Sequence, residues 1–205
     1  MLSLNLINIR SRYYLLAKMV IITTVIHFIF SQSTYAIEDN TQLKKINNFR
    51  QYNDNFASSG QPTKEQLMLV KNSGAERVIY LAFNNNSSAL KDEDRLVTSL
   101  GMTYIHIPVD FDNPQLPEFQ IFSSIMKQNQ QKTLLHCQVN FRASTFSFLY
   151  RVLSLNEPIH EAKEALDSVW EPNEIWFQYI KNTLAHYSVD YDCDKCDWGA
   201  YELMY

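Results

Sequence analysis

The chain has 205 residues, of which 46% are hydrophobic, 13% aromatic and 20% charged, and its formal net charge is −4. This composition excludes a disordered chain and is typical of one globular domain with a sizeable core. Residues 1–36 hold three of the 18 basic residues and none of the 22 acidic ones, so the remainder carries 15 basic against 22 acidic side chains, a net charge of −7. An acidic domain without a basic stripe is a poor candidate for binding nucleic acid or an anionic membrane face.

The N-terminal segment, residues 1–36, has the pattern of a secretory signal peptide. Basic residues precede an apolar run at 19–30, and Thr34 and Ala36 supply the small residues that a signal peptidase site requires. The apolar run is too short to span a bilayer comfortably. We therefore expect an exported, periplasmic domain that keeps no stable membrane span once the leader is cleaved. An uncleaved N-terminal anchor is the alternative.

Strands alternate with helices along residues 37–190, which we expect to form the folded domain. The predicted strands lie at 55–59, 78–83, 104–109 and 133–136. The predicted helices lie at 63–73, 90–100, 119–131, 159–170 and 173–186, and another follows the segment 137–144. Pro114 and Pro117 predict an irregular loop at 110–117. This alternation predicts an α/β fold with three layers, in which helices cover both faces of a largely parallel central sheet.

The first predicted helix carries clear boundary signals. Thr63 and Gln66 form a T-x-x-Q capping box, and Gly74 suits the position just after a helix end. The following run at 78–83 is continuously apolar, as expected of a parallel strand that is buried on both faces.

The three cysteines divide into a close pair and a single residue. Cys193 and Cys196 lie in a tail that we assign to residues 191–205, and in an oxidising compartment they would form a disulfide. Two soft ligands are too few for a zinc site, so we expect neither a metal nor another cofactor. Cys137 is left unpaired, which is a hazard in such a compartment unless the thiol is used. This favours a catalytic Cys137 over its alternative role as a small buried core residue.

Residues 133–145 predict an anion site around that cysteine. A short strand ends at His136, a turn follows Cys137, and a helix begins near Arg142. A loop that enters a helix N-terminus aims several backbone N–H groups at one point. These groups, the helix dipole and Arg142 would all favour the thiolate of Cys137, giving an activated sulfur nucleophile beside a cradle for an oxyanion.

Three motifs together resemble a known family. They are Ser59-Gly-Gln-Pro-Thr63, Ile107-Pro-Val-Asp110 and the His136-Cys137…Arg142…Ser144 loop. The chain resembles the protein-tyrosine and dual-specificity phosphatase superfamily, and within it the bacterial beta-lactamase-hydrolase-like, DUF442-type proteins. The resemblance implies hydrolysis of phosphate monoesters through a phosphocysteine intermediate. The substrate would be a phosphorylated small molecule, lipid or protein.

The same resemblance implies roles for individual residues. Cys137 would attack phosphorus, Arg142 would clamp the phosphoryl oxygens, and Asp110 would protonate the leaving group. Asp112 is the second candidate for that acid, and either aspartate could instead only stabilise a turn. His136 would orient the loop, or it is simply a buried histidine. The substrate-binding cradle would consist of Gln138, Val139, Asn140, Phe141, Ala143 and Ser144, with Asn140 in a left-handed conformation.

The loop departs from the family pattern in one respect. Four residues separate Cys137 from Arg142, whereas the family has five, and Ala143 occupies the position where the arginine is expected. A four-residue spacing also resembles rhodanese-type sulfurtransferases, which carry a persulfide on the cysteine. The competing hypotheses are therefore a sulfurtransferase and a non-catalytic anion-binding module. Three features favour the phosphatase: Ser144 keeps the distance from Cys137 that the family pattern has, His136 precedes the cysteine, and Asp110 and Asp112 lie upstream.

Overall fold

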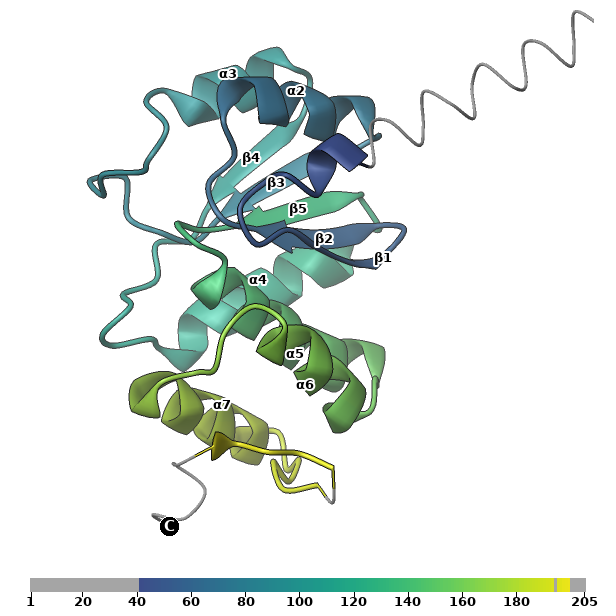
Figure 1. Ribbon diagram of the computed structural model, residues 1–205, viewed down its shortest axis with the longest axis vertical. Helices are drawn as coiled ribbons and strands as arrows, with labels where there is room; N and C mark the ends of the chain where they lie inside the picture. The colour runs from purple at the N-terminus through teal and green to yellow at the C-terminus, as the bar shows by residue number, and fades with distance from the viewer. Residues whose placement is uncertain (1–40, 194, 200–205) are drawn as a thin grey trace, which may run out of the picture. The chain divides into compact units, whose positions relative to one another are not determined.

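The computed structural model describes residues 41–193 and 195–199 (Figure 1). The predicted leader at 1–36 lies outside the described residues, so the signal peptide and the alternative anchor stay predictions. No helix in the described part of the chain is long and apolar enough to cross a membrane. From Gln42 onward the described residues belong to one structural unit.

The centre of this unit is a five-stranded sheet with the strand order β1-β2-β5-β3-β4. The strands are β1 (Arg50–Asn53), β2 (Phe56–Ser59), β3 (Arg77–Tyr80), β4 (Thr103–His106) and β5 (Thr133–His136). β2, β5, β3 and β4 run parallel, and β1 pairs antiparallel with β2 at the edge. The four parallel strands confirm the predicted ones. β1 was not predicted because its half-exposed sequence RQYN has no apolar run.

Helices cover both faces of the sheet, which confirms the predicted three-layer α/β fold. They are α2 (Lys64–Asn72), α3 (Glu93–Ser99), α4 (Leu116–Gln128), α5 (Phe141–Leu155), α6 (Ile159–Asp167) and α7 (Glu174–His186). α2 and α3 lie on one face, and α4 and α5 lie on the other with α6 and α7 beyond them (Figure 1). α2 begins with the predicted capping box of Thr63 and Gln66.

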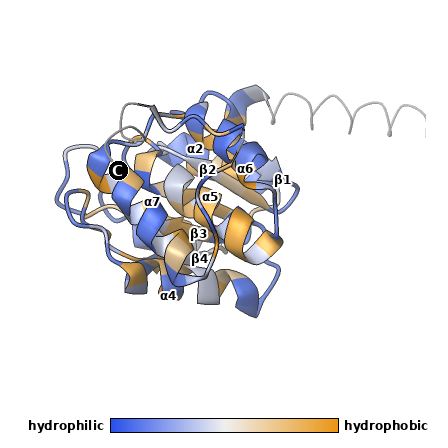
Figure 2. Ribbon diagram, turned by 90° about the horizontal axis from the view of Figure 1, so that it is seen from below, coloured by the Kyte–Doolittle hydropathy of each residue, from blue (hydrophilic) through white to orange (hydrophobic). Residues whose placement is uncertain are grey.

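The two faces bury different side chains. The face under α2 and α3 is mostly aliphatic, with Leu67, Val78, Val97 and Leu134 at its centre. The opposite face is rich in aromatic rings that pack between α4, α5 and α7, among them Phe119, Phe122, Phe146, Trp176 and Phe177. α5 lies between the sheet and the outer helices, and every residue from Arg142 to Val152 is buried. Figure 2 accordingly shows hydrophobic residues along α5 and a mixture of residues along the outer helix α7.

Some predicted helix boundaries were wrong by three residues: α4 and α6 end earlier than predicted, at Gln128 and Asp167, and α4 also begins earlier. The segment 110–117 was expected to be irregular throughout, but α4 begins at Leu116 and includes Pro117 in its first turn. Gln115 and Glu118 form a capping box there. A proline in the first turn costs little because its missing N–H would have no partner inside the helix.

Residues after α7 also pack against the domain, through Tyr191 and Trp198. The predicted disulfide between Cys193 and Cys196 is present, with its Cα atoms 5.2 Å apart. Trp198 is buried and contacts Phe148 and Phe177, with ring centroids 5.9 and 5.6 Å away. Cys137 is the free cysteine of the described residues, and it is buried.

Candidate active site

The candidate site lies where β5, the central strand, ends. Cys137 follows the last residue of β5, and α5 begins four residues later at Phe141. The Cys137 backbone N–H donates to Ser59 O at the end of the neighbouring strand β2, at 3.2 Å. The carboxyl ends of parallel strands are the usual place for ligands in open α/β sheets.

Asn140 has the left-handed backbone that was predicted for it, with φ 74°. Its side-chain Nδ2 donates to Asn48 O at 2.6 Å, while Asn48 Nδ2 donates back to Val139 O at 2.9 Å. No side chain caps the N-terminus of α5, and the buried Oδ1 of Asn140 has no hydrogen-bond partner among the described residues. The first-turn N–H groups of α5 therefore have no intrahelical or capping acceptor and are available to an anion.

A second contact holds the loop from the β2 side. Gly60 forms an isolated antiparallel bridge with Val139, and the Gln61 N–H donates to Gln138 O at 3.0 Å. A Cβ atom at position 60 would lie 2.9 Å from Gln138 O and 3.1 Å from Asn47 Cβ. Gly60 is therefore required by the close approach of two backbones.

Arg142 is buried, with 6% of its surface exposed, and extends toward the loop that carries both candidate acids. Its guanidinium carbon lies 5.3 Å from the centroid of the Phe111 ring. Among the described residues, its buried Nε has no hydrogen-bond partner. An unpaired guanidinium N–H in such a position is costly, and an anionic ligand would supply the missing acceptor.

Asp110 and Asp112 flank Phe111 and are both exposed. The Asp112 N–H donates to Asp110 Oδ1 at 3.0 Å, which is a local turn contact. Trp176 Nε1 donates to Phe111 O at 3.0 Å and fixes this loop to α7. The structure thus places the aspartate loop beside Arg142, and the role of either aspartate as general acid stays a prediction.

Aromatic rings form one wall of the site. Phe141 stacks on Trp170 with centroids 4.3 Å apart and an interplanar angle of 4°. Phe111 lies 6.0 Å from Trp170 and 5.6 Å from Trp176. The remaining predicted cradle residues lie in the first turn of α5, where Ala143 is buried and Ser144 Oγ donates to Phe141 O at 3.1 Å.

His136 is fully buried and sits in a cluster that includes a residue missed by sequence reasoning. Its ring stacks on Tyr80 at 4.7 Å, and its Nε2 lies 3.4 Å from Glu93 Oε1. Gln61 Nε2 donates to the same Glu93 oxygen at 2.8 Å. A glutamate at a helix start is unremarkable in sequence, so nothing there pointed to a buried carboxyl group. The same is true of Asn48, whereas Gly60 lies in the recognised Ser59–Thr63 motif.

Burial also sets the charge of this cluster. Loss of water raises the pKa of Glu93 to about 7, against the hydrogen bond from Gln61 and with a smaller contribution from Asp94. The same loss of water lowers the pKa of His136 to about 3. Below pH 7 the cluster is therefore a neutral carboxyl group beside a neutral imidazole.

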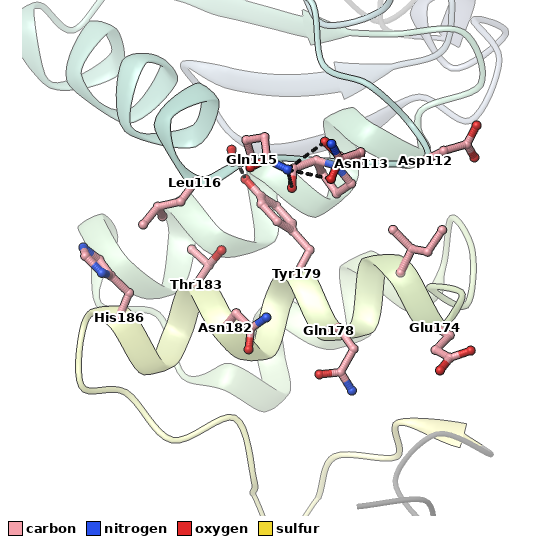
Figure 3. Close-up of a pocket in the computed structure, with 12 residues that line it drawn as sticks. Asp112, Asn113, Gln115, Leu116, Glu174, Gln178, Tyr179, Asn182, Thr183 and His186 are labelled. Atoms are coloured by element: carbon pink, nitrogen blue, oxygen red, sulfur yellow. Dashed lines mark hydrogen bonds between the residues drawn. The ribbon is translucent and has the colours of Figure 1, made fainter.

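Two open grooves lie on the surface of the domain. One, of about 590 Å³, borders the cysteine loop and is lined in part by Gln61, Lys64, Gln138 and Val139. The other, of about 630 Å³, lies between residues 112–116 and α7 and is rich in carboxamide side chains (Figure 3). Of these two grooves, the first includes residues of the cysteine loop and the second does not.

The chain is similar to several solved structures. One, from Shewanella putrefaciens CN-32 and described as a putative phosphatase (DUF442), is 31% identical, with a TM-score of 0.66; the match covers 74% of this chain and 98% of that one. TpbA of P. aeruginosa, in complex with pTyr, is 14% identical over 69% of this chain and 91% of its own, with a TM-score of 0.56. SIW14 of S. cerevisiae, a PP-IP phosphatase, is 14% identical over 66% and 85%, with a TM-score of 0.53.

No protein-family model matches the chain, and no curated protein matches it. The likeness to TpbA and SIW14, at this low identity, shows a shared fold. The Shewanella protein is the closer guide because almost its whole length is matched at higher identity.

Proposed function

The chain belongs to the DUF442 family of phosphatase-like proteins, and we propose that it is a cysteine-dependent phosphatase that hydrolyses phosphate monoesters. The observation that carries the proposal is that Cys137 follows the end of β5 while Arg142 lies in the first turn of α5, at the other end of one short loop. The buried Arg142 Nε lacks an acceptor, and the N-terminus of α5 lacks a side-chain cap. Both features suit a bound phosphoryl group.

The first step would transfer the phosphoryl group to the enzyme. The Cys137 thiolate attacks phosphorus, the S–P bond forms, and the bond from phosphorus to the ester oxygen breaks. The leaving oxygen takes a proton from Asp110, with Asp112 as the other candidate. The α5 N–H groups and Arg142 bind the equatorial oxygens, on which the charge is spread.

The second step would release phosphate. A water molecule attacks the phosphocysteine, its proton passes to the aspartate, and the S–P bond breaks to restore the thiolate. Inorganic phosphate then leaves. The loop needs no metal for this sequence, because its N–H groups and the guanidinium supply the electrostatic stabilisation.

A persulfide-carrying sulfurtransferase is the second candidate. The observation in its favour is the four-residue spacing between Cys137 and Arg142, which makes a tighter loop than the phosphatase pattern. The aspartate loop beside Arg142 argues against it, since sulfur transfer requires no acid for an alkoxide leaving group.

The substrate would be a phosphorylated small molecule, lipid or protein. The groove beside Gln138 and Val139 is open, so it leaves room for a substrate that extends beyond its phosphate. The comparison structures include a complex with pTyr and a PP-IP phosphatase. If the leader is a cleaved signal peptide, the enzyme would act in the periplasm.

Steady-state assays separate the candidates. We expect hydrolysis of para-nitrophenyl phosphate by the wild type and none by Cys137→Ser. Asp110→Asn should lower kcat for poor leaving groups more than for good ones, and Asp112→Asn tests the alternative acid in the same way. Transfer of sulfur from thiosulfate to cyanide without any phosphate hydrolysis would overturn the phosphatase. Sulfate binding without either activity would favour the anion-binding module.

A further inference from the structure

Glu93 is a buried carboxyl group that the proposed reaction does not use. It is the first residue of α3 and is only 4% exposed. Among the ion pairs of the described residues, none joins Glu93 to a lysine or arginine. The neighbour of its carboxyl group there is the imidazole of His136. Carboxylates are seldom buried without a cation or several donors, so the position of Glu93 requires an explanation.

The contacts of Glu93 connect it to both sides of the cysteine loop. Gln61, whose side chain donates to Glu93, also donates its backbone N–H to Gln138 O. His136, whose Nε2 lies 3.4 Å from Glu93, immediately precedes Cys137. The Glu93 carboxyl group therefore contacts His136, which precedes Cys137, and Gln61, which binds the carbonyl group of Gln138 just after Cys137.

We propose that Glu93 is a positioning residue for the anion cradle, and that the cradle is competent while Glu93 is protonated and weakened when Glu93 ionises. This inference rests on the proposed function. The neutral carboxyl group can accept from Gln61 and offer its proton to the imidazole of His136. The ionised group would place an unpaired negative charge behind a cradle that must itself bind an anion.

No lysine or arginine forms an ion pair with Glu93 among the described residues. The titratable groups around the cluster are Asp94 on α3, Tyr80 on β3, Tyr104 and His106 on β4, His136 on β5 and Cys137 after it, and Arg142 on α5 acts electrostatically on Tyr80. Burial raises the pKa of both tyrosines, so they stay neutral, and it lowers the pKa of His136. His106 Nε2 is engaged with Ala82 O at 2.7 Å.

The working pH range follows from the direction of these shifts. The pKa of Glu93 is raised to about 7. The Glu93 carboxyl group is therefore fully protonated at the acidic pH where an ordinary carboxyl group begins to ionise, and it loses its proton as the pH rises through 7. The pKa of His136 is lowered to about 3, so this ring stays neutral across the same interval. The cradle should therefore bind anions better at pH 6 than at pH 8.

Sulfate binding to the Cys137→Ser chain tests the proposal without interference from the thiol or from turnover. Sulfate is a tetrahedral dianion whose charge is constant in this range. We expect its affinity to fall about tenfold between pH 6 and pH 8, and to fall much less when Glu93→Gln is added. His106 is common to both proteins, so the difference between them isolates Glu93. Glu164→Gln, at an exposed position on α6, is the matched control and should keep the fall.

Two outcomes would overturn the proposal. One is a loss of sulfate affinity between pH 6 and pH 8 that is equally large in Cys137→Ser and in the double variant with Glu93→Gln. The other is a carbon-13 NMR titration in which the Glu93 carboxyl group of the wild type ionises near its ordinary pKa. The NMR titration also decides the matter if the double variant fails to fold. Failure of the phosphatase itself would be seen separately, as absent para-nitrophenyl phosphate turnover with sulfate binding and its pH dependence intact.

Discussion

The cysteine loop is held by hydrogen bonds on one side and by aromatic packing on the other. On the polar side, Asn48 Nδ2 donates to Val139 O and the Gln61 N–H donates to Gln138 O, while Gly60 is paired with Val139 in an isolated bridge. These contacts fix the backbone path of the loop. They come from segments that lie more than 75 residues earlier in the chain.

On the aromatic side, Phe111 receives the Arg142 guanidinium on its ring, while its carbonyl accepts from Trp176. These contacts determine where the arginine and the aspartate loop lie. The backbone cradle is therefore held by the polar contacts, whereas Arg142 and the aspartate loop are held by the aromatic contacts. Changes on the polar side should alter stability and anion binding together, whereas changes on the aromatic side should act mainly on rate.

We expect the largest effect on activity from a change at Arg142, which contacts Phe111 on the aromatic side and would bind the phosphoryl group. Arg142→Lys keeps the positive charge but loses the planar fork, so we expect kcat/KM for para-nitrophenyl phosphate to fall by about 10² to 10³. The exposed Arg95→Lys is the control and should leave kcat/KM unchanged. Activity of Arg142→Lys within a few-fold of wild type would show that the guanidinium does not bind the transition state.

On the polar side, Gly60→Ala should have the next largest effect. The new Cβ would press on Gln138 O and Asn47, so we expect a loss of about 2–3 kcal/mol in the free energy of unfolding and at least tenfold weaker sulfate binding. Urea unfolding and calorimetry measure the two quantities. Gly101→Ala, at φ 74° but with open space, should lower stability without changing sulfate affinity. Equal behaviour of the two variants would contradict a role for Gly60 in the loop.

Asn48→Ala removes one polar contact and leaves the Val139 carbonyl without its donor. We expect a loss of about 1–2 kcal/mol in stability and a several-fold weaker affinity for sulfate. Asn72→Ala, at an exposed position on α2, serves as the control. If Asn48→Ala lowers stability but leaves sulfate affinity at the wild-type value, the polar side supports the fold without shaping the cradle.

The smallest effect is expected from Trp176→Phe, which keeps an aromatic ring but removes the donor to Phe111 O. We expect a few-fold fall in kcat with unchanged sulfate affinity, and a stability loss of about 1 kcal/mol. Trp198→Phe loses a comparable bond to Tyr191 O far from the loop and should change stability alone. If kcat falls in both variants, the fall in Trp176→Phe is due to general destabilisation and not to the loss of the bond to Phe111 O.

Much of the fold could be predicted because its signals are local. The apolar runs at 78–83 and 133–136, the Thr63 capping box and the left-handed Asn140 depend on the residues of one segment. Pro117 was misjudged because a proline in the first turn of a helix looks in sequence like a proline in a loop. β1 was missed because an edge strand can form without an apolar run.

The site was predictable to a lesser degree for a physical reason. Cys137 and Arg142 could be identified because one loop contains both. The residues that hold this loop are brought to it by tertiary structure: Asn48 from before β1 and Glu93 from α3. Asparagine and glutamate are common on surfaces, so neither the half-buried Asn48 nor the buried Glu93 leaves a trace in the local pattern.

The most direct test of the central claim is to trap the intermediate. The wild type would be mixed with para-nitrophenyl phosphate, quenched in acid during turnover, digested and analysed by mass spectrometry. We expect a phosphoryl group on the peptide that contains Cys137, and we expect it to form at least as fast as the enzyme turns over. The same peptide of Cys137→Ser should carry no phosphoryl group. Phosphate release that continues without this adduct, or that survives in Cys137→Ser, would contradict it.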